Sequence, residues 1–309
     1  MTLETTFQKL DQNNYKTLQK AIENIDNLEN TSALYLYLLK YYDVTVFYKI
    51  NSNSIYFICK LEKDLIIDNI LIQDYYAIKP IIKSDQNYTT IFSDFVKIFK
   101  TLTNKDSLFI DRMLEINFES LPKFNILYTW EIAYLYEVEQ LKYFAGKKMQ
   151  KKRNLLNFFN KNYLDKTTIK KYDSKYNKDI LDFCKQHIQK YSDVFREHEY
   201  LAIEELITIA SNENNISGTI IYYESNIVGV TLGYTHNLYY EIFLEKANKD
   251  FKGSYQFLLS NNLILNDINT KYIDRQDGES ISGLIDSKRS YKPIKIISGN
   301  LLEINVNDN

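Results

Sequence analysis

The pattern of apolar and polar positions predicts alternating strands and helices along most of the chain. In the first half it predicts helices near 3–28, 32–42 and 89–103 and strands near 44–50, 54–61, 65–72, 74–79 and 107–111. In the second half it predicts helices near 176–191, 200–211, 253–266 and 281–287 and strands near 218–224, 227–235, 239–246, 271–275 and 293–298. Strands in succession followed by a helix are typical of mixed layers, so the predicted class is α+β.

A domain boundary is predicted between the two halves. The alternating apolar residues of YTWEIAYLYEV (128–138) predict a strand, and the helical pattern of residues 139–163 follows it. All eight glycines lie at or after Gly146, so the first half lacks the permissive residues that tight ligand loops usually need. We therefore predict a structural domain at 1–135 and a domain that carries the site at 136–309.

Composition indicates a globular protein of 309 residues, with 45% hydrophobic and 25% charged residues. A formal net charge of −2 gives no global attraction to nucleic acid or anionic lipid, so such a contact needs a local patch. No apolar run approaches the roughly 18 residues that span a bilayer. Glu4, Lys9 and Asp11 make the N-terminus unlike a signal peptide. A cytoplasmic protein is expected, with peripheral contact at the inner membrane face as an open alternative.

Cysteine and histidine usage excludes several kinds of site. Two cysteines are too few for a disulfide framework, and no spacing of His, Cys, Asp and Glu is typical of a metal site. Cys184 and His187 would share one helix face, but a buried thiol beside a surface imidazole is the favoured interpretation. No G-x-S-x-G elbow occurs, so direct transfer is favoured over a covalent serine intermediate.

Charged residues of the second half fall in two informative places. Lys147, Lys148, Lys151, Lys152 and Arg153 form a basic run, for which a solvated face is the ordinary explanation and polyanion binding the alternative. Period-two geometry on the strand 239–246 places Glu241, Phe243 and Glu245 on one side, and Tyr240, Ile242, Leu244 and Lys246 on the other. Each glutamate is a separate candidate base or a solvent-facing charge.

A strand that leads into a helix at a glycine can bind an anion. The segment after residue 246 reaches Gly253 and Ser254 at the predicted helix start, where backbone N–H groups and the helix dipole favour a diphosphate. The segment is poor in glycine for such a loop, which argues against acetyl-CoA.

Several separated blocks of the chain resemble a known family. They are YLYEVEQLKYFAGKKMQKKRN (134–154), FREH (195–198), IVGVTLGY (227–234), YYEIFLEKAN (239–248), DFKGSYQ (250–256), YIDRQD (272–277), ISGL (281–284) and SKRSYKP (287–293). In this order they resemble the soluble C-terminal domain of phosphatidylglycerol lysyltransferases, which also occurs as stand-alone bacterial proteins, over roughly residues 30–295. The resemblance implies two tandem GNAT-like domains, with mixed central sheets flanked by helices and the active site in the second.

The residues themselves and the resemblance together give a set of functional candidates. The catalytic candidates are Glu241, Glu245, Tyr255 and Asp277. The binding candidates are Lys152, Arg153, Glu204, Lys246, Gly253, Ser254, Arg275, Lys288 and Arg289. Lys246 and Arg275 would bind a carboxylate or phosphate, Lys288 and Arg289 a second anionic group, and Tyr255 would donate a hydrogen bond or a proton. Where the family shows an N-R-E-x-D-like run, this chain has D-R-Q-D, so Gln276 replaces a carboxylate.

Three functions remain open from the sequence. The leading one is an acyltransferase or aminoacyltransferase that moves an activated group onto an amine or hydroxyl, with aminoacyl-tRNA or acyl-CoA as donor and a small molecule, peptide or lipid as acceptor. The second is an acetyl-CoA-dependent N-acetyltransferase. The third is a non-catalytic binding module on a decayed transferase fold, which Gln276 and the glycine-poor loop favour.

Overall fold

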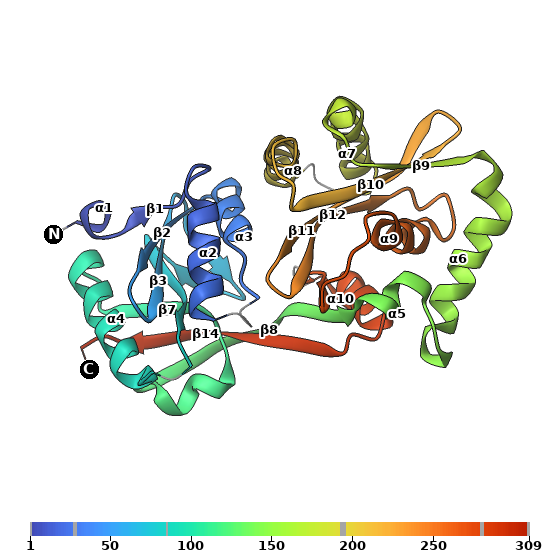
Figure 1. The fold of residues 1–309 in the computed structure, drawn as a ribbon. Helices are drawn as coiled ribbons and strands as arrows, with labels where there is room; N and C mark the ends of the chain where they lie inside the picture. The colour runs from blue at the N-terminus through green and yellow to red at the C-terminus, as the bar shows by residue number, and fades with distance from the viewer. Residues whose placement is uncertain (1, 27–29, 85, 192–195, 279–280, 308–309) are drawn as a thin grey trace. The chain divides into compact units, whose positions relative to one another are not determined.

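The structure is a computed structural model that describes residues 2–26, 30–84, 86–191, 196–278 and 281–307. Phe195 of the F-R-E-H block lies outside these residues. The chain forms two compact units, Met1–Ile132 with Ser298–Asn309, and Ala133–Ile297. Each unit is a mixed sheet flanked by helices (Figure 1), so the predicted α+β class is confirmed. None of the described helices is long and apolar enough to cross a membrane.

The first unit contains four α-helices and seven strands of its own within the described residues. The helices are α1 (Leu3–Thr6), α2 (Tyr15–Ile25), α3 (Ala33–Leu38) and α4 (Tyr88–Thr103), with 3-10 turns at Leu39–Tyr42 and Glu115–Ser120. The strands are β1 (Gln8–Lys9), β2 (Val44–Ile50), β3 (Ser54–Leu61), β4 (Leu65–Ile67), β5 (Ile70–Ile72), β6 (Tyr75–Ile82) and β7 (Ser107–Met113). Antiparallel pairs join β1, β2, β3 and β6 in that order, and β6 pairs parallel with β7.

Two predicted elements of the first unit are wrong. The single strand expected at 65–72 is a hairpin of β4 and β5, because Asp68 and Asn69 adopt positive φ angles and reverse the chain. The long helix expected near 3–28 is interrupted by β1, which pairs with β2; residues 27–28 of that prediction lie outside the described residues.

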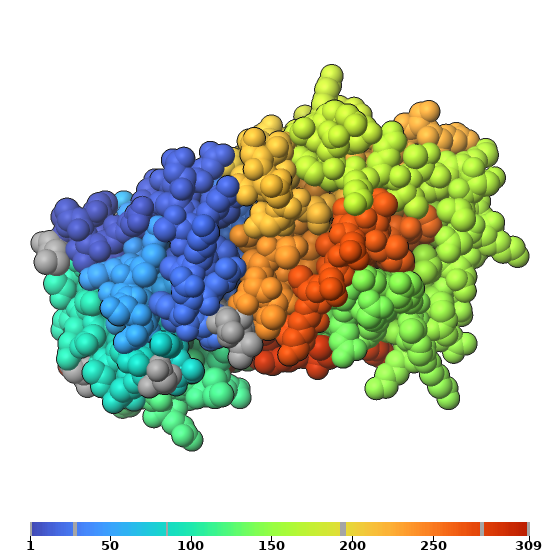
Figure 2. All heavy atoms as spheres, in the orientation of Figure 1, coloured from blue at the N-terminus to red at the C-terminus, as the bar shows by residue number. Residues whose placement is uncertain are grey.

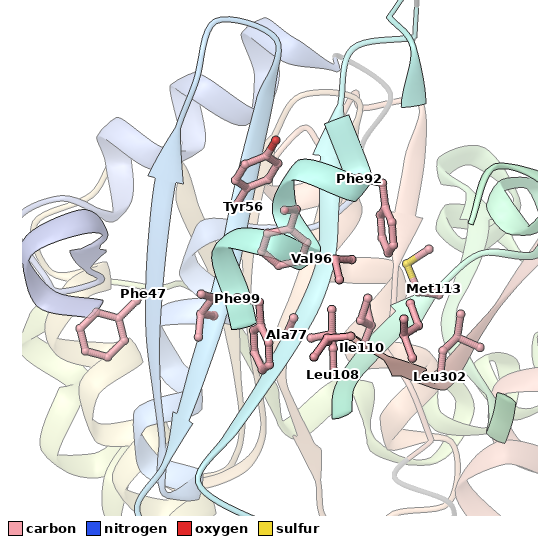
Figure 3. Packing of buried hydrophobic residues seen from close by; sticks show 14 of the residues in the cluster. Phe47, Tyr56, Ala77, Phe92, Val96, Phe99, Leu108, Ile110, Met113 and Leu302 are labelled. Carbon is pink, nitrogen blue, oxygen red and sulfur yellow. The ribbon is translucent and has the colours of Figure 1, made fainter. Parts of the chain in front are cut away.

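The core of the first unit lies between α4 and the sheet (Figure 3). Phe92, Phe95 and Phe99 recur at helical spacing on α4 and are fully buried. Strand β14 (Lys295–Asn305) pairs with β7, with Leu302 opposite Ile110, and so completes this core. Residues 298–309 therefore belong to the first unit, whereas the predicted boundaries placed them in the second domain; the pairing of β14 is not visible in local sequence.

The second unit, Ala133–Ile297, carries the candidate site. Its helices are α5 (Val138–Tyr143), α6 (Gln150–Tyr163), α7 (Asn177–Tyr191), α8 (Glu197–Ala210), α9 (Ser254–Leu265) and α10 (Ser282–Ser290), with 3-10 turns at Lys147–Met149, Leu164–Lys166 and Ser174–Tyr176. Its strands are the end of β8 (Phe124–Glu137), β9 (Thr167–Lys171), β10 (Ile216–Tyr223), β11 (Asn226–His236), β12 (Tyr239–Ala247) and β13 (Tyr272–Asp274). Strand β9 was not predicted from the sequence.

The sheet of the second unit has helices on both faces. Strands β9, β10, β11 and β12 pair antiparallel in sequence order, β12 pairs parallel with β13, and β13 pairs antiparallel with β8. Tyr240 and Ile242 of β12 pack with Leu141 of α5 and Leu259 of α9 on one face. Helices α7 and α8 cover the other face (Figure 1).

The basic segment before α6 does not continue the helix expected over 139–163. Phe144 and Gly146 adopt φ angles of 46° and 81°, which end α5 and turn the chain before α6 begins. The Arg153 guanidinium donates to the carbonyl oxygens of both residues, at 2.6 and 3.0 Å. Arg153 therefore holds this turn, and α6 starts in a new direction.

Candidate functional site

A bulge in β12 decides which charged side chains meet. Leu244 pairs with Leu232, and Ile242 pairs with Gly233, so Phe243 is an extra residue without an opposite partner. One inserted residue exchanges the faces on which all following side chains lie. The prediction that Glu241 and Glu245 share a side is therefore wrong: Glu245 joins the face of Tyr240 and Ile242.

Glu245 forms a buried ion pair with Arg275, the residue that follows β13. Arg275 donates to Oε2 of Glu245 through Nε at 3.1 Å and through Nη2 at 2.7 Å. The side chain of Glu245 is only 10% exposed and that of Arg275 only 9%. Oε1 of Glu245 and Nη1 of Arg275 are buried without a hydrogen-bond partner in the described part of the chain. A buried donor and acceptor left open are costly unless a ligand satisfies them.

Aromatic rings form the surroundings of this pair. The guanidinium carbon of Arg275 lies 4.5 Å from the ring centroid of Tyr291, and the ammonium of Lys152 lies 3.7 Å from the same centroid. Gln256 of α9 donates to the Tyr291 hydroxyl at 2.5 Å, which fixes the ring. Burial raises the pKa of Tyr291 to about 12, so its hydroxyl stays neutral. Although burial opposes it, Glu245 raises the pKa of Arg275, which stays charged.

Lys288 holds the backbone that carries Arg275. Its buried ammonium donates to the carbonyl oxygens of Arg275, Gln276 and Asp277. Burial, and then repulsion from Arg275, lowers the pKa of Lys288 to about 8. From the sequence we expected Lys288 to bind an anionic group. In the structure its ammonium instead donates to three backbone carbonyl oxygens.

Tyr255 lies in the first turn of α9, at the end of β12 where the chain leaves the sheet. Its hydroxyl is 3.3 Å from Nε2 of His187, and this Nε2 lies 3.2 Å from the carbonyl oxygen of Ala247. Because a carbonyl can only accept, the contact with Ala247 places the hydrogen on Nε2, and this nitrogen then cannot accept the Tyr255 proton. Burial, and then Lys246, lowers the pKa of His187 to about 4, so the imidazole is neutral.

Glu241 lies on the opposite face of the sheet, within a buried polar cluster. It is in register with Asp274, accepts a hydrogen bond from Nε2 of Gln276 at 3.1 Å, and has an oxygen 3.4 Å from His236 Nε2. The Gln276 N–H donates to Asp274 at 2.8 Å. A carboxylate at position 276 would face the Glu241 carboxylate, and Gln276 replaces that repulsion with a hydrogen bond. No group of three or more His, Cys, Asp or Glu among the described residues could hold a metal ion.

The cluster makes stability depend on pH through Asp274. Burial, and then Glu241, raises its pKa from 3.8 to about 7. The folded protein therefore holds this proton more tightly than the unfolded chain, and stability falls as pH rises from about 4 to about 7. We expect the unfolding free energy of wild type to drop from pH 5 to pH 8 by about 2–3 kcal/mol more than that of Asp274→Asn, measured by urea unfolding. Equal pH profiles would contradict this assignment.

Lys246 also lies on this second face, away from Arg275. It pairs with Glu199 of α8 at 2.6 Å. The nearby Cys184 is buried, and burial raises the pKa of its thiol to about 12. Since His187 contacts Ala247 and Tyr255, the structure does not assemble a Cys184–His187 pair. The structure thus separates Lys246 from Arg275, with which the sequence grouped it.

The start of α9 packs against α6. Gly253 has φ 91°, and a Cβ built on it would lie 2.1 Å from the carbonyl oxygen of Leu155. The Ser254 hydroxyl donates to the Asn248 carbonyl at 2.8 Å. A carbonyl oxygen beside this helix start opposes a bound diphosphate, so Gly253 and Ser254 serve the junction between helices.

The remaining candidates lie outside the Glu245–Arg275 cluster. Glu204 on α8 and Arg289 on α10 are exposed, and Arg153 is engaged by backbone carbonyls. Asp277 contributes its carbonyl oxygen to Lys288. Of the residues chosen from sequence, the structure gathers Lys152, Glu245 and Arg275, with Lys288 and Tyr255 beside them.

Sequence analysis missed the aromatic and amide parts of the cluster. Tyr291 stands within SKRSYKP, and Tyr136, whose ring centroid lies 5.9 Å from the Arg275 guanidinium carbon, falls in the alternating segment 128–138, so both had a signal. Gln256 lies within DFKGSYQ, and His187 was considered only together with Cys184. Neither was assigned to this site, because each contacts a residue distant in sequence.

Comparisons with known proteins identify relatives of this chain. Residues 130–298 match the model of the family described as "Phosphatidylglycerol lysyltransferase, C-terminal". An uncharacterized protein of Mycoplasmoides gallisepticum is 31% identical, covering 96% of this chain and 99% of that protein.

Two solved structures share the fold. A conserved protein of unknown function from Bacteroides thetaiotaomicron has a TM-score of 0.77 at 18% identity, covering 96% of this chain and 98% of that one. The C-terminal domain of a proposed lysylphosphatidylglycerol synthetase from Agrobacterium fabrum has a TM-score of 0.61 at 12% identity, covering 94% of this chain and 92% of that one. The fold is thus the one that the resemblance implied.

Proposed function

The chain belongs to the family of the phosphatidylglycerol lysyltransferase C-terminal domain, and from this premise we propose that it transfers an aminoacyl group from an activated donor to an amine or hydroxyl acceptor. Family and fold support an acyltransferase. The aminoacyl group is the finer part of the proposal. It rests on one observation: within the same buried ion pair, Oε1 of Glu245 and Nη1 of Arg275 are both left open.

The two open atoms match an aminoacyl group better than a simple acyl group. An aminoacyl ester offers a cationic α-ammonium donor and, two atoms away, a carbonyl acceptor. Oε1 of Glu245 can accept from the ammonium while Nη1 of Arg275 donates to the carbonyl oxygen. An acetyl group has the carbonyl alone, so it would leave Glu245 buried and unsatisfied.

Direct transfer follows from the same arrangement. The acceptor nitrogen or oxygen forms a bond to the carbonyl carbon, negative charge develops on the carbonyl oxygen, and the Arg275 guanidinium stabilises that charge. As the carbon–oxygen bond to the donor breaks, the leaving oxygen needs a proton. Tyr255 has a hydroxyl proton that His187 does not accept, and Tyr255 gives it to the leaving oxygen. The acceptor's own proton then passes to the Tyr255 phenolate and restores the neutral hydroxyl. Glu241 lies on the other face and takes no part.

The acetyl-CoA alternative has less support. Its diphosphate would need the start of α9, where the Leu155 carbonyl and the Ser254–Asn248 hydrogen bond already lie. The non-catalytic alternative drew on Gln276, yet Gln276 donates to Oε1 of Glu241 on the other face and leaves Arg275 in place. A donor such as aminoacyl-tRNA remains part of the proposal.

Amino-acid amides test this proposal, because they keep the α-ammonium and carbonyl without hydrolysing. We expect at least one amide to raise the thermal midpoint, since a ligand at 100 times its Kd stabilises the folded state by about 2.7 kcal/mol. The matching N-acetylated amides, which lack the ammonium, and acetyl-CoA are expected to leave the midpoint unchanged.

Glu245→Gln provides the matched variant, since it keeps the shape and removes the charge that the ammonium needs. It should bind the amide about tenfold or more weakly and lose the preference over the N-acetylated compound. Equal binding of both compounds to wild type, or a shift with acetyl-CoA alone, would contradict aminoacyl recognition.

A further inference from the structure

Lys152 differs from the other lysines of its segment. Residues 147–163 contain no Asp or Glu, and α6 lies at the surface of the second unit (Figure 2). Lys148 and Lys151 are exposed, whereas Lys152 is half-buried and lies over the ring of Tyr291. Among the described residues, none forms a hydrogen bond or an ion pair with its amino group. The Lys152 nitrogen is therefore held in place without being occupied by a partner in that part of the chain.

Lys152 also lies beside the ion pair to which the acyl group is assigned. The guanidinium carbon of Arg275 lies 4.5 Å from the ring centroid of Tyr291, and the Lys152 nitrogen lies 3.7 Å from the same centroid. Both Arg275 and Glu245 act electrostatically on Lys152. An acyl group bound at this pair therefore lies close to the Lys152 nitrogen, and a nucleophile held beside an acyl group reacts far faster than one in solution.

The surroundings of Lys152 favour the neutral amine. Burial, and then Arg275, lowers its pKa to about 8, with Glu245 opposing the shift and Lys292 adding to it. At pH 7 roughly one such amino group in ten is neutral, against fewer than about one in a thousand for a lysine with the ordinary pKa of 10.5. Desolvation and a neighbouring cation are the two influences that activate a lysine as a nucleophile.

We propose that Lys152 is an internal acyl acceptor, whose amino group takes the acyl group from an ester donor bound at the Glu245–Arg275 pair. The inference rests on the proposed function, because that function places the acyl group at this pair. The neutral nitrogen forms a bond to the carbonyl carbon, and the carbon–oxygen bond to the donor breaks. The nitrogen loses one proton and the leaving oxygen gains one, so the Lys152 side chain becomes an uncharged amide and the donor leaves as an alcohol.

Lys288 provides a comparison within the chain, since its pKa is also lowered to about 8. Its buried ammonium donates to the carbonyl oxygens of Arg275, Gln276 and Asp277. An amino group that is held by three carbonyl oxygens cannot attack a carbon until it has left them. Geometry therefore distinguishes the two lysines where the pKa does not, and of the two we expect Lys152 to react.

Phenyl acetate, added in a limiting amount near pH 7, tests the amine without any aminoacyl recognition. Peptide mapping by mass spectrometry should show Lys152 acetylated about tenfold or more faster than Lys151 or Lys288, because its larger neutral share outweighs its lower basicity. The preference over Lys151 should shrink as the pH approaches 10 and vanish in concentrated urea. Equal rates for Lys152 and Lys151 near pH 7, or a preference that persists in urea, would overturn the proposal.

The cyanomethyl ester of an amino acid tests transfer from a donor, since it carries the α-ammonium and an activated carbonyl. It should aminoacylate Lys152 in wild type and equally in Lys151→Arg, which changes the exposed neighbour. In Lys152→Arg, which keeps the cation but cannot take the group, no other lysine of the segment should become modified in its place. Reaction of Lys152 with phenyl acetate but not with the amino-acid ester would show that the donor does not reach it, which would also overturn the proposal.

Protection by an amino-acid amide separates this inference from the proposed function. An amide that fills the Glu245–Arg275 pair should slow aminoacylation of Lys152 by about tenfold or more when it is present far above its Kd. Modification of Lys152 by both esters without such protection would contradict aminoacyl recognition and leave Lys152 as an acyl acceptor. A thermal shift with the amide, together with no modification of Lys152 by either ester, would support aminoacyl recognition and overturn the internal acceptor alone.

Discussion

Replacing Arg275 with methionine is expected to destabilise the protein by about 3–5 kcal/mol. The change leaves the Glu245 carboxylate buried without the guanidinium that donates to it twice. A buried charge that loses its partner keeps its full desolvation penalty. Urea unfolding measures the loss, and the same variant should no longer bind an amino-acid amide.

Two further variants distinguish the stability that comes from the Glu245–Arg275 ion pair from the general effect of removing an arginine side chain. In Arg275→Met with Glu245→Gln the buried charge is gone, so most of the lost stability should return, and a double-mutant cycle gives the coupling. Arg289→Met removes the same side chain from an exposed position on α10 and should change stability by less than about 0.5 kcal/mol. Additive effects at 245 and 275 would show that the two side chains do not act as a pair.

The elements of the second unit were predictable where local pattern decides them. The strand predicted at 227–235 is β11, Asn226–His236, and the helix predicted at 253–266 is α9, Ser254–Leu265. Alternation and helical spacing persist there because each element buries one well-defined face. Strand β9 was missed because TTIKK has little apolar alternation and pairs at the edge of the sheet through its backbone.

Individual residues of the site were easier to predict from the sequence than their arrangement. Glu245 and Arg275 were both selected from sequence, yet the strand geometry assumed for Glu245 was wrong because Phe243 is inserted at a bulge. No residue type near Phe243 marks that insertion, since the register depends on β11 opposite. Lys246 was grouped with Arg275 as an anion-binding residue, and the structure pairs it with Glu199 of α8 on the other face.

The basic run shows a second limit of local pattern. From sequence, Lys147 to Arg153 are equivalent positive charges, and the helix was expected to pass through them. The turn at Phe144 and Gly146 makes them unequal, because it turns Arg153 onto backbone carbonyls and Lys152 toward Tyr291. Only the contact with Tyr291, more than a hundred positions away, distinguishes the half-buried Lys152 from the exposed lysines of the run.

Gly253 connects this helix arrangement to the site, and Gly253→Ala is expected to destabilise the protein by more than about 3 kcal/mol. A left-handed φ of 91° is unfavourable for alanine, and its Cβ would lie 2.1 Å from the Leu155 carbonyl oxygen. To relieve that overlap α9 must move away from α6, which separates the stacked rings of Phe159 and Phe257, now 4.3 Å apart. The first turn of α9 would move with it, including Tyr255 and Gln256.

Gly283→Ala is the matched control, because the same added methyl group would meet no atom within 4 Å at that position of α10. Alanine favours a helix over glycine by about 0.8–1 kcal/mol, so this variant should be neutral or more stable. Urea unfolding of the two variants therefore separates the cost of the junction from the effect of any Gly-to-Ala change. If Gly253→Ala were as stable as Gly283→Ala, α6 and α9 would not be packed as described, and Lys152 could not be held over Tyr291 by that packing.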